Sequence, residues 1–513
     1  MLQSAREEMK RYYFTTPIYY VNDIPHIGHA YTTIAVDTIV LWKKLMGKDV
    51  YFLTGTDEHG LKISQTAQNN NISEEKFIEP IVASFKNLWK ELDIVYDDFI
   101  RTTEKRHRTV VQEFFQALYD KDEIYKGIYK GWYCVYCETY YTASQITGEV
   151  CPECKRELKE VEEESYFFRL SKYTDFLLEF YERNPEFLQP KERANEIINF
   201  VKTGLRDLSV SRLKVKWGIP VPFDKSHTIY VWFDALLNYL TGAGFLADKV
   251  KFSQLWPCDI HFVGKEIFKF HAVIWPAMLK AYGLELPKKV FAHGWWTNEG
   301  DKISKSKGNV IYPLEIVEKY GIDPLRYFLF REISFGADGD FSREAFLRRY
   351  NHDLANDLGN LVSRTMNMLD KYLTAGFKRG KKEVKSLPVE NIESLIKDIS
   401  LSYDSAQFQQ SLFCIWKVIE SANRYIEIKA PWSMAKKSDP DLEKVLLDLY
   451  CMVKLVAIFI YPIMPHTACK IWESINCVEE IEKVCVELFK YNLIKIEQSN
   501  KSFDKILPLF PRQ

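Results

Sequence analysis

The fold is decided by the stretch YYFTTPIYYVNDIPHIGHAYTTIAVDTIVLWKKLMGKDVYFLT, residues 12–54. Residues 12–21 are rich in aromatic and branched side chains, which indicates a buried strand. Residues 31–45 repeat apolar side chains at helical spacing, and Gly47 is placed to end that helix. Residues 49–54 form a second strand pattern. Strand, turn, helix and strand make a βαβ unit, which predicts a parallel sheet in an α/β fold.

The rest of the chain divides around this unit. Strand-like runs at residues 228–233, 261–263 and 290–296 follow only after a segment with four Cys, many Tyr and acidic runs, which indicates an insertion. From about residue 341, helix-period segments dominate, for example 356–372, 412–428 and 442–460, and predict an all-helical bundle. We therefore expect four segments: a Rossmann-like nucleotide-binding domain in two halves, 1–115 and 227–340, an inserted connective domain, 116–226, and an α-helical domain, 341–513.

Bulk composition narrows the class of protein. The 513 residues carry a net charge of −1, which does not point to nucleic acid, although local basic patches can still bind it. We find no apolar run of 18 residues and no secretory signal, so we expect no membrane partner and a cytoplasmic location. The ten Cys then predict reduced thiols and metal ligands rather than a disulfide framework.

Two motifs suit phosphate chemistry. His26-Ile27-Gly28-His29 follows a strand and opens a helix, where glycine lets the backbone approach a phosphate and the imidazoles can donate to its oxygens. Lys302-Ile303-Ser304-Lys305-Ser306 is a cationic loop suited to a pyrophosphate leaving group. Each motif alone is also explained by an ordinary polar turn or loop. Together, in one split α/β domain, they favour a functional phosphate-binding site over two unrelated polar loops.

A metal site is indicated by two Cys-x-x-Cys pairs, formed by Cys134, Cys137, Cys151 and Cys154. Four thiolates at this spacing can surround one tetrahedral Zn²⁺. Because all four positions are filled by protein, we expect one closed, structural zinc knuckle per chain in the inserted domain. The alternative is four ordinary buried thiols.

The two phosphate motifs resemble those of the class I aminoacyl-tRNA synthetases, and further motifs resemble the methionyl-tRNA synthetases over nearly the whole chain. The motifs that carry this resemblance are Thr15 to Asn22, Thr54 to Gly60, Tyr230 to Ala235, Gly264-Lys265-Glu266, Phe270-His271, His293 to Trp296 and Pro431-Trp432. The resemblance implies that ATP and L-methionine form methionyl-adenylate and pyrophosphate, and that methionine is then transferred to the 3′-terminal ribose of tRNA(Met).

The resemblance also implies the residues of each site. Catalysis would fall to His26, His29, Lys302 and Lys305, and ATP, with Mg²⁺, would contact His26, Gly28, His29, Gly264, Glu266, Gly294, Lys302, Ser304, Lys305 and Ser306. Methionine would contact Ile18, Tyr20, Asp57, Arg212, Trp232, Ala235, Tyr239, Phe270 and His271. The CAU anticodon would contact Asn356, Asn360, Arg364 and Trp432, the first three of which recur at helical spacing.

Some expectations stay open at this point. The family usually has Gly-x-Asp at the ATP ribose, and Glu266 keeps the carboxylate with one extra methylene. The sequence does not decide between a monomer and a homodimer, and it leaves open whether a separate C-terminal-type tRNA-binding subunit exists. Another adenylate-forming ligase and a catalytically silent tRNA-binding protein are the alternative functions. The helical domain with Trp432 opposes the first, and the intact motifs oppose the second.

Overall fold

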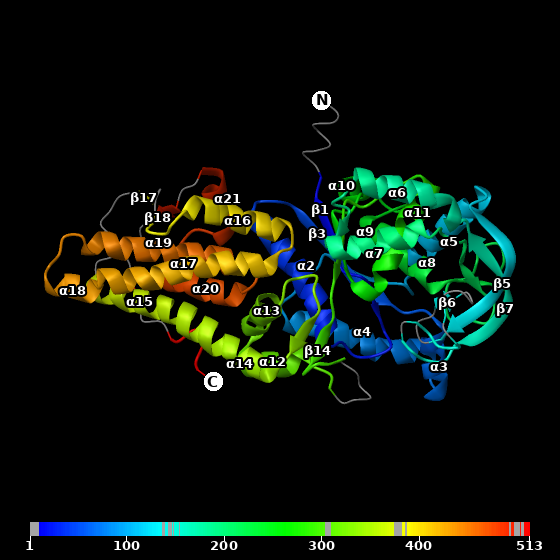
Figure 1. Ribbon diagram of the computed structural model, residues 1–513, viewed down its shortest axis with the longest axis horizontal. Coiled ribbons are helices and arrows are strands. Elements are labelled where there is room, and N and C mark those ends of the chain that lie inside the picture. Colours follow the sequence, from blue (N-terminus) through cyan, green and yellow to red (C-terminus); the bar gives the residue numbers. More distant parts are fainter. Residues whose placement is uncertain are drawn as a thin grey trace, which may run out of the picture. The chain divides into compact units, whose positions relative to one another are not determined.

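The computed structural model describes residues 10–135, 139–141, 146, 148–152, 154–302, 309–373, 382–384, 387–491, 494–496, 503 and 507–512. Residue contacts divide the chain into two compact units, residues 1–25 with 51–293 and residues 26–50 with 294–513. Each unit is built around its own core, and Figure 1 shows where their helices and strands lie. None of the described helices is long and apolar enough to cross a membrane.

The first unit is centred on a seven-stranded sheet in the order β2-β3-β1-β12-β13-β8, with β4 beside β3. Its strands are β1 (Tyr12–Thr15), β2 (Tyr19–Tyr20), β3 (Val50–Asp57), β4 (Asp98–Arg101), β8 (Leu188–Gln189), β12 (Ile260–Gly264) and β13 (Val290–His293). The pairings of β3 with β2 and β4, of β12 with β1 and β13, and of β13 with β8 are all parallel. The expected parallel α/β fold is confirmed.

The helices of this unit pack through their apolar faces on the sheet and on one another. They are α3 (Leu61–Asn69), α4 (Glu74–Glu91), α5 (Lys105–Asp120), α6 (Thr174–Arg183), α7 (Lys191–Lys202), α8 (Val231–Leu236), α9 (Asn238–Ala243), α10 (Lys249–Leu255) and α11 (Trp275–Tyr282). Short 3-10 or π turns lie at Leu170–Tyr173, Lys265–Ile267 and Phe270–Ile274. The largest side chains of this core are buried Trp and Tyr residues such as Trp275, Tyr13 and Tyr239.

A second, antiparallel sheet belongs to the inserted segment. It contains β5 (Ile124–Cys134), β6 (Thr139–Tyr141), β7 (Lys159–Phe168) and β9 (Leu208–Ser209), in the order β6-β5-β7-β9. A short pair, β10 (Ser211–Arg212) and β11 (Thr228–Ile229), follows it. Figure 1 shows β5 and β7 as one long curved ribbon. Because β8 and α7 lie within the expected inserted segment and yet β8 joins the parallel sheet, the boundaries at 115, 226 and 340 stay predictions.

The second unit joins α2 (Ile27–Leu45) to the C-terminal half of the chain. It has a small sheet of β14 (Trp296–Asn298), β15 (Asp301–Lys302) and β16 (Gly339–Phe341), and a pair of β17 (Lys382–Val384) and β18 (Ile494–Ile496). Its helices are α12 (Pro313–Tyr320), α13 (Ile322–Arg331), α14 (Arg343–Arg349), α15 (Asn360–Tyr372), α16 (Ile392–Asp404), α17 (Phe408–Lys429), α18 (Pro431–Lys436), α19 (Leu442–Ile460), α20 (Pro465–Ser474) and α21 (Ile481–Tyr491). The expected helical bundle is confirmed.

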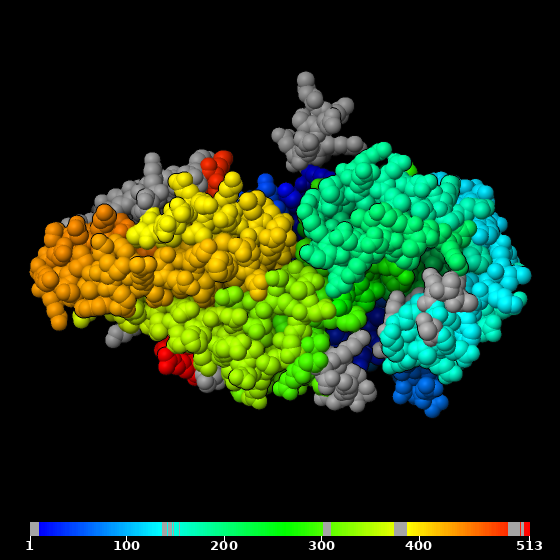
Figure 2. Space-filling model, viewed as in Figure 1, coloured from blue at the N-terminus to red at the C-terminus, as the bar shows by residue number. Residues whose placement is uncertain are grey.

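Helix α19 is the centre of this bundle. Every residue from Val445 to Ile460 is buried, and α19 packs against α15, α17 and α20. A helix that is apolar on all sides is stable in water only when neighbours surround it. In Figure 2 the yellow and orange surface belongs to the layer of α16, α17 and α18.

The sequence patterns were wrong at three places. The strand expected over 12–21 is interrupted at Pro17, which has no N–H to donate, so β1 and β2 are two separate short strands. The run at 228–233 turns into helix α8 at Val231. The run at 290–296 breaks at Gly294, where a Cβ atom would lie 2.2 Å from the Ala337 carbonyl oxygen. At Val231 the aromatic residues reflect burial rather than strand structure, whereas the other two runs are strands broken by a turn.

Candidate active site

The His motif forms the N-terminus of α2. The Nδ1 atom of His26 accepts from the Gly28 N–H at 3.1 Å, and Nδ1 of His29 accepts from the His26 N–H at 3.1 Å. Since both Nδ1 atoms accept, each neutral imidazole carries its proton on Nε2. Burial and the neighbouring His26 hold the pKa of His29 well below its usual value. The helix start therefore presents two Nε2–H donors beside the positive end of the helix dipole.

The Lys motif is described only in part. Lys302 ends β15, which pairs with β14 through Thr297. Ser304, Lys305 and Ser306 lie outside the described residues. Gly294, the other predicted ATP contact of this unit, must be glycine because of its close approach to Ala337.

Asp57 is the last residue of β3, and hydrogen bonds fix the residues on either side of it. Tyr20 and Asp57 are partners in the β2–β3 register. The fully buried carboxylate of Glu58 accepts from Thr56, Thr103 and Arg101, at 2.6, 2.6 and 2.7 Å, to its Oε1, Oε2 and Oε1 atoms. A carboxylate with this many donors fixes its backbone, so Asp57 is placed rigidly at the carboxyl end of the sheet.

The predicted methionine residues of α8, α9 and the π turn at Phe270–Ile274 meet in pairs. Trp232 stacks on Phe270, with ring centroids 3.9 Å apart and planes 8° apart. The Tyr239 hydroxyl lies 2.7 Å from His271 Nε2, and His271 Nδ1 lies 3.0 Å from the Ile267 carbonyl oxygen. A carbonyl only accepts, so Nδ1 carries the proton and the Tyr239 hydroxyl donates to Nε2.

Burial controls the charge of this pair. Burial lowers the pKa of His271 to about 4, opposed by its hydrogen bond to Ile267, and burial raises the pKa of Tyr239. Both groups are therefore neutral near pH 7. Ala235 and Ile18 add apolar surface, Ala235 fully and Ile18 partly buried. The result is an aromatic, uncharged environment with one polar pair, as suits a thioether.

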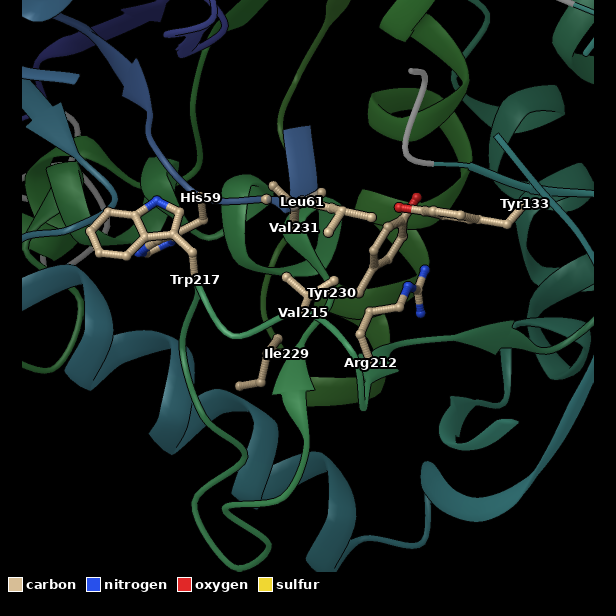
Figure 3. Close-up of a pocket in the computed structure, with 10 residues that line it drawn as sticks. His59, Leu61, Tyr133, Arg212, Val215, Trp217, Ile229, Tyr230 and Val231 are labelled. Carbon is tan, nitrogen blue, oxygen red and sulfur yellow. The ribbon is translucent and has the colours of Figure 1, made fainter. Parts of the chain in front are cut away.

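A pocket adjoins this environment in the first unit. Figure 3 shows Trp217 beside His59 at one end, Arg212 with Tyr230 and Tyr133 at the other, and aliphatic side chains between. The Arg212 guanidinium carbon lies 4.1 Å from the centre of the Tyr230 ring, a cation–π contact. Arg212 also donates to the Ser209 and Ser211 carbonyls and the Ser209 hydroxyl, at 3.3, 2.7 and 3.0 Å. Arg212 is thus held inside the protein, 5% exposed.

The predicted ribose contact lies just after β12. A Cβ at Gly264 would lie 2.5 Å from the Glu266 carboxylate, so glycine makes the room that this longer side chain needs. Glu266 is exposed and belongs to the 3-10 turn at Lys265–Ile267. Its carboxylate is therefore directed back over the strand end, where a bound nucleotide is expected in a parallel sheet.

The Cys pairs come together where the structure describes them. The Sγ atoms of Cys134, Cys151 and Cys154 all lie within 4.8 Å of one another, and Cys134 and Cys154 are 3.5 Å apart. None of the three forms a disulfide. Tetrahedral zinc would place thiolates about 3.8 Å apart, so the donor set fits Zn²⁺. Cys137 lies outside the described residues.

The predicted anticodon residues lie in the second unit. A π-helical segment, Tyr350–Gly359, precedes α15, so Asn356 lies in a wider turn than Asn360 and Arg364. Arg364 pairs with Glu427 at 2.7 Å and lies 5.9 Å above the ring of Trp432, which is 40% exposed. Asn356 accepts from Arg512 at 2.6 Å. Arg364 and Trp432 are brought together, whereas Asn356 is tied to the C-terminal segment.

Sequence reasoning missed several buried charged or polar residues. They are Asp37, Glu58, His59, His107, Asp234 and Arg326, together with the partly buried Arg101 and Trp217 that contact Glu58. Asp37 had a usable signal, because it is the single carboxylate of the apolar helix 27–45. Asp234 and Arg326 also lie in apolar runs, but the sequence does not show which distant residues pair with them.

Family models match most of the chain. The model described as tRNA synthetases class I (M) matches residues 12–163 and 158–366, and that of the anticodon-binding domain of tRNA ligase matches residues 389–507.

Curated relatives agree with these models. The methionine–tRNA ligase of Caldanaerobacter subterraneus is 49% identical over 95% of this chain and 77% of its own length. That of Rickettsia conorii is 46% identical over 91% of this chain and 93% of its own. Among solved structures, Mycobacterium tuberculosis methionyl-tRNA synthetase in complex with methionyl-adenylate is 38% identical, with a TM-score of 0.91 over 98% of this chain and 100% of that chain.

Proposed function

The chain belongs to the class I tRNA synthetases, among the methionine–tRNA ligases, and on that premise we propose the following reaction for it. L-methionine reacts with ATP to give methionyl-adenylate and pyrophosphate, and the methionyl group is then transferred to the 3′-terminal ribose of tRNA(Met). The observation that carries the proposal, beside the family, is the helix start at which His26 and His29 cap each other and present two Nε2–H donors.

Adenylate formation needs positioning and charge stabilisation more than acid–base chemistry. The methionine carboxylate is ionised near pH 7 and attacks the α-phosphorus of ATP, while the bond to the β-phosphate oxygen breaks and pyrophosphate leaves. His26 and His29 donate to the phosphate oxygens, on which charge accumulates. Lys302 and Lys305 take the β- and γ-phosphates, with Mg²⁺ accompanying ATP. Gly264, Glu266 and Gly294 serve the nucleoside.

Methionine binds among the aromatic pairs. Asp57 binds the α-ammonium of methionine, and Trp232 packs against the methionine side chain. Arg212 lies at one end of the adjoining pocket. The Tyr239–His271 pair, whose two groups are both neutral, supplies the polar contact near sulfur. A site that hydrogen-bonds its ligand rejects an apolar isostere better than a pocket selecting by size alone, where a methylene is worth about 1–3 kcal/mol.

The second substrate is a tRNA. Trp432 offers an exposed ring for stacking on an unpaired base, and Arg364 and Asn360 lie on the helix beside it. One Zn²⁺, held by Cys134, Cys151 and Cys154 with Cys137, stiffens the inserted sheet and takes no part in the reaction. Reduced thiols persist in a reducing compartment, which favours the cytoplasm. The proposed functional form is a monomer or a homodimer, with or without a separate tRNA-binding subunit.

The test is ATP–pyrophosphate exchange with each of the twenty amino acids in turn. We expect exchange with methionine and, with tRNA(Met) added, acid-stable charging. Exchange with cysteine but not methionine would overturn the substrate. No exchange with any amino acid, but retained tRNA binding, would favour the silent tRNA-binding alternative.

A further inference from the structure

A buried carboxylate lies behind the proposed methionine site. Asp234 is 0% exposed and is in α8, between Trp232 and Ala235, which are both predicted methionine contacts. Its Oδ2 lies 2.7 Å from His59 Nδ1, and its Oδ1 lies 2.7 Å from His107 Nε2. One carboxylate therefore joins three separate parts of the first unit: the loop after β3, the first turn of α5, and α8.

The direction of these hydrogen bonds follows from the groups involved. An ionised carboxylate only accepts, so both imidazoles donate to Asp234. Burial disfavours the charged carboxylate, but His59 and His107 offset it and hold the pKa of Asp234 below its usual value. The other ring nitrogen of His107 also has a partner, since Nδ1 lies 3.0 Å from the Thr241 hydroxyl of α9. The carboxylate is thus ionised and fully engaged.

His59 carries this restraint into the loop with Asp57. Its ring packs edge-on against Trp217, with centroids 5.7 Å apart. Trp217 also binds the residues on either side of His59. The Trp217 Nε1–H donates to the Glu58 carbonyl at 2.5 Å, and the Trp217 carbonyl accepts from the Gly60 N–H at 3.2 Å. Figure 3 shows His59 and Trp217 together at the edge of the pocket. Glycine is required after His59, because Gly60 has a φ of 122°.

We propose that Asp234 is a positioning residue for methionine activation, which acts through His59 to hold the Asp57 loop against the helix that carries Trp232 and Ala235. The inference rests on the proposed function, because Asp57 and Trp232 are methionine contacts only under that function. Asp234 itself touches no substrate. Its effect is to fix the separation between the group that takes the ammonium and the ring that takes the side chain.

A purely structural role makes a different prediction. A core ion pair that only stabilises the fold changes the melting temperature and leaves substrate affinities alone, or weakens all of them together. A positioning role weakens methionine selectively, because misplacement of a binding group by about 1 Å can cost up to 100-fold. The predicted phosphate contacts His26 and His29 belong to the other compact unit, and the predicted nucleoside contacts Gly264 and Glu266 lie outside the loops that Asp234 joins, so ATP affinity serves as the internal reference.

The experiment compares Asp234→Asn with Asp259→Asn in the full-length chain. Both carboxylates are buried, and Asp259 likewise has two partners, the Tyr13 N–H at 2.8 Å and Lys288 at 2.5 Å, but it precedes β12 at the opposite end of the strand. ATP–pyrophosphate exchange gives KM for methionine and for ATP. We expect Asp234→Asn to raise the methionine KM about tenfold or more and to change the ATP KM by less than about twofold. Asp259→Asn should change neither.

A second pair of variants covers the case in which Asp234→Asn does not fold. His59→Ala removes the link, whereas His59→Asn places an amide donor near the position of Nδ1. We expect His59→Ala to raise the methionine KM selectively and His59→Asn to recover at least part of that loss. Unchanged methionine KM values, parallel changes for both substrates, or no difference between His59→Ala and His59→Asn would overturn the positioning role.

Failure of this inference can be told apart from failure of the proposed function. If the unmodified chain exchanges with no amino acid, or with one other than methionine, the proposed function fails and the variants are not needed. If the unmodified chain exchanges with methionine and the Asp234 and His59 variants behave like Asp259→Asn, only the positioning role fails.

Discussion

Removal of one charge inside the second unit should be unusually costly. Asp37, in the middle of α2, pairs with Arg326 of α13 at 2.7 Å, and their side chains are 5% and 1% exposed. Arg326 also donates to the Pro462 and Ile463 carbonyls, at 3.0 and 2.8 Å, between α19 and α20. We consider Asp37→Asn, which keeps the shape of the side chain and removes the carboxylate charge that pairs with the buried guanidinium.

The magnitude follows from burial. Breaking a buried ion pair by neutralising one partner costs about 3–5 kcal/mol, because the other charge stays desolvated. At roughly 2–4 °C per kcal/mol for a unit of this size, the melting transition should fall by about 6–20 °C. The carbonyl contacts of Arg326 remain, so we expect the lower part of this range.

The assay is thermal and urea unfolding followed by tryptophan fluorescence, with hydrogen exchange to assign the transition to α2, α13 and α20. The matched control is Asp404→Asn, whose carboxylate pairs with Lys43 of the same helix at 2.7 Å but is 44% exposed. Exposed pairs contribute about 0–1 kcal/mol, so the control should barely shift. Equal effects of Asp37→Asn and Asp404→Asn would refute the argument from burial.

Four further outcomes are expected. Lys305→Ala should slow adenylate formation by about 3–4 kcal/mol of barrier, the scale for a lost transition-state donor, and unchanged exchange kinetics would contradict its role. Trp432→Ala should spare exchange and weaken tRNA charging, whereas equal loss of both would indicate a folding role. Cys151→Ala should abolish one equivalent of bound zinc by elemental analysis; full zinc content would disprove the site. His271, with a folded pKa of about 4, should contribute about 3 kcal/mol of stability above pH 6.5 that is lost as pH falls toward 4, and His271→Asn should flatten that part of a pH–stability curve.

Local patterns predicted the fold where one physical rule dominated. The apolar spacing over residues 31–45 and 442–460 predicted helices whose C-terminal ends agree with those of α2 and α19. This spacing is informative because a helix must bury one face or be surrounded by other elements. Residues 49–54 were correctly predicted as a strand, now part of β3, because a strand of a parallel sheet is buried on both faces. The patterns failed at Pro17 and Val231, where backbone chemistry and tertiary packing overrode the preference of aromatic residues for strands.

The candidate site was only partly predictable for a different reason. Motifs such as His26 to His29 act through neighbours in sequence, since His26 and His29 cap each other within one helical turn. Resemblance could therefore transfer them residue by residue. The grouping of α2 with the C-terminal half of the chain could not be predicted, because it depends on Asp37 and Arg326, which are 289 positions apart along the chain and look like ordinary charged residues.

The same distinction separates binding groups from the groups that hold them. Asp57 and Trp232 can be proposed from motifs because the resemblance implies a direct ligand contact for each. Asp234 stands two residues from Trp232 in the same motif, yet its partners are 175 and 127 positions away and nothing in the sequence pairs them. A buried carboxylate is tolerated only where several donors surround it, so its presence restricts which loops can meet there. Rigid placement of Asp57 is then a consequence of satisfying Asp234 and Glu58, and substrate selectivity depends on residues that the substrate never touches.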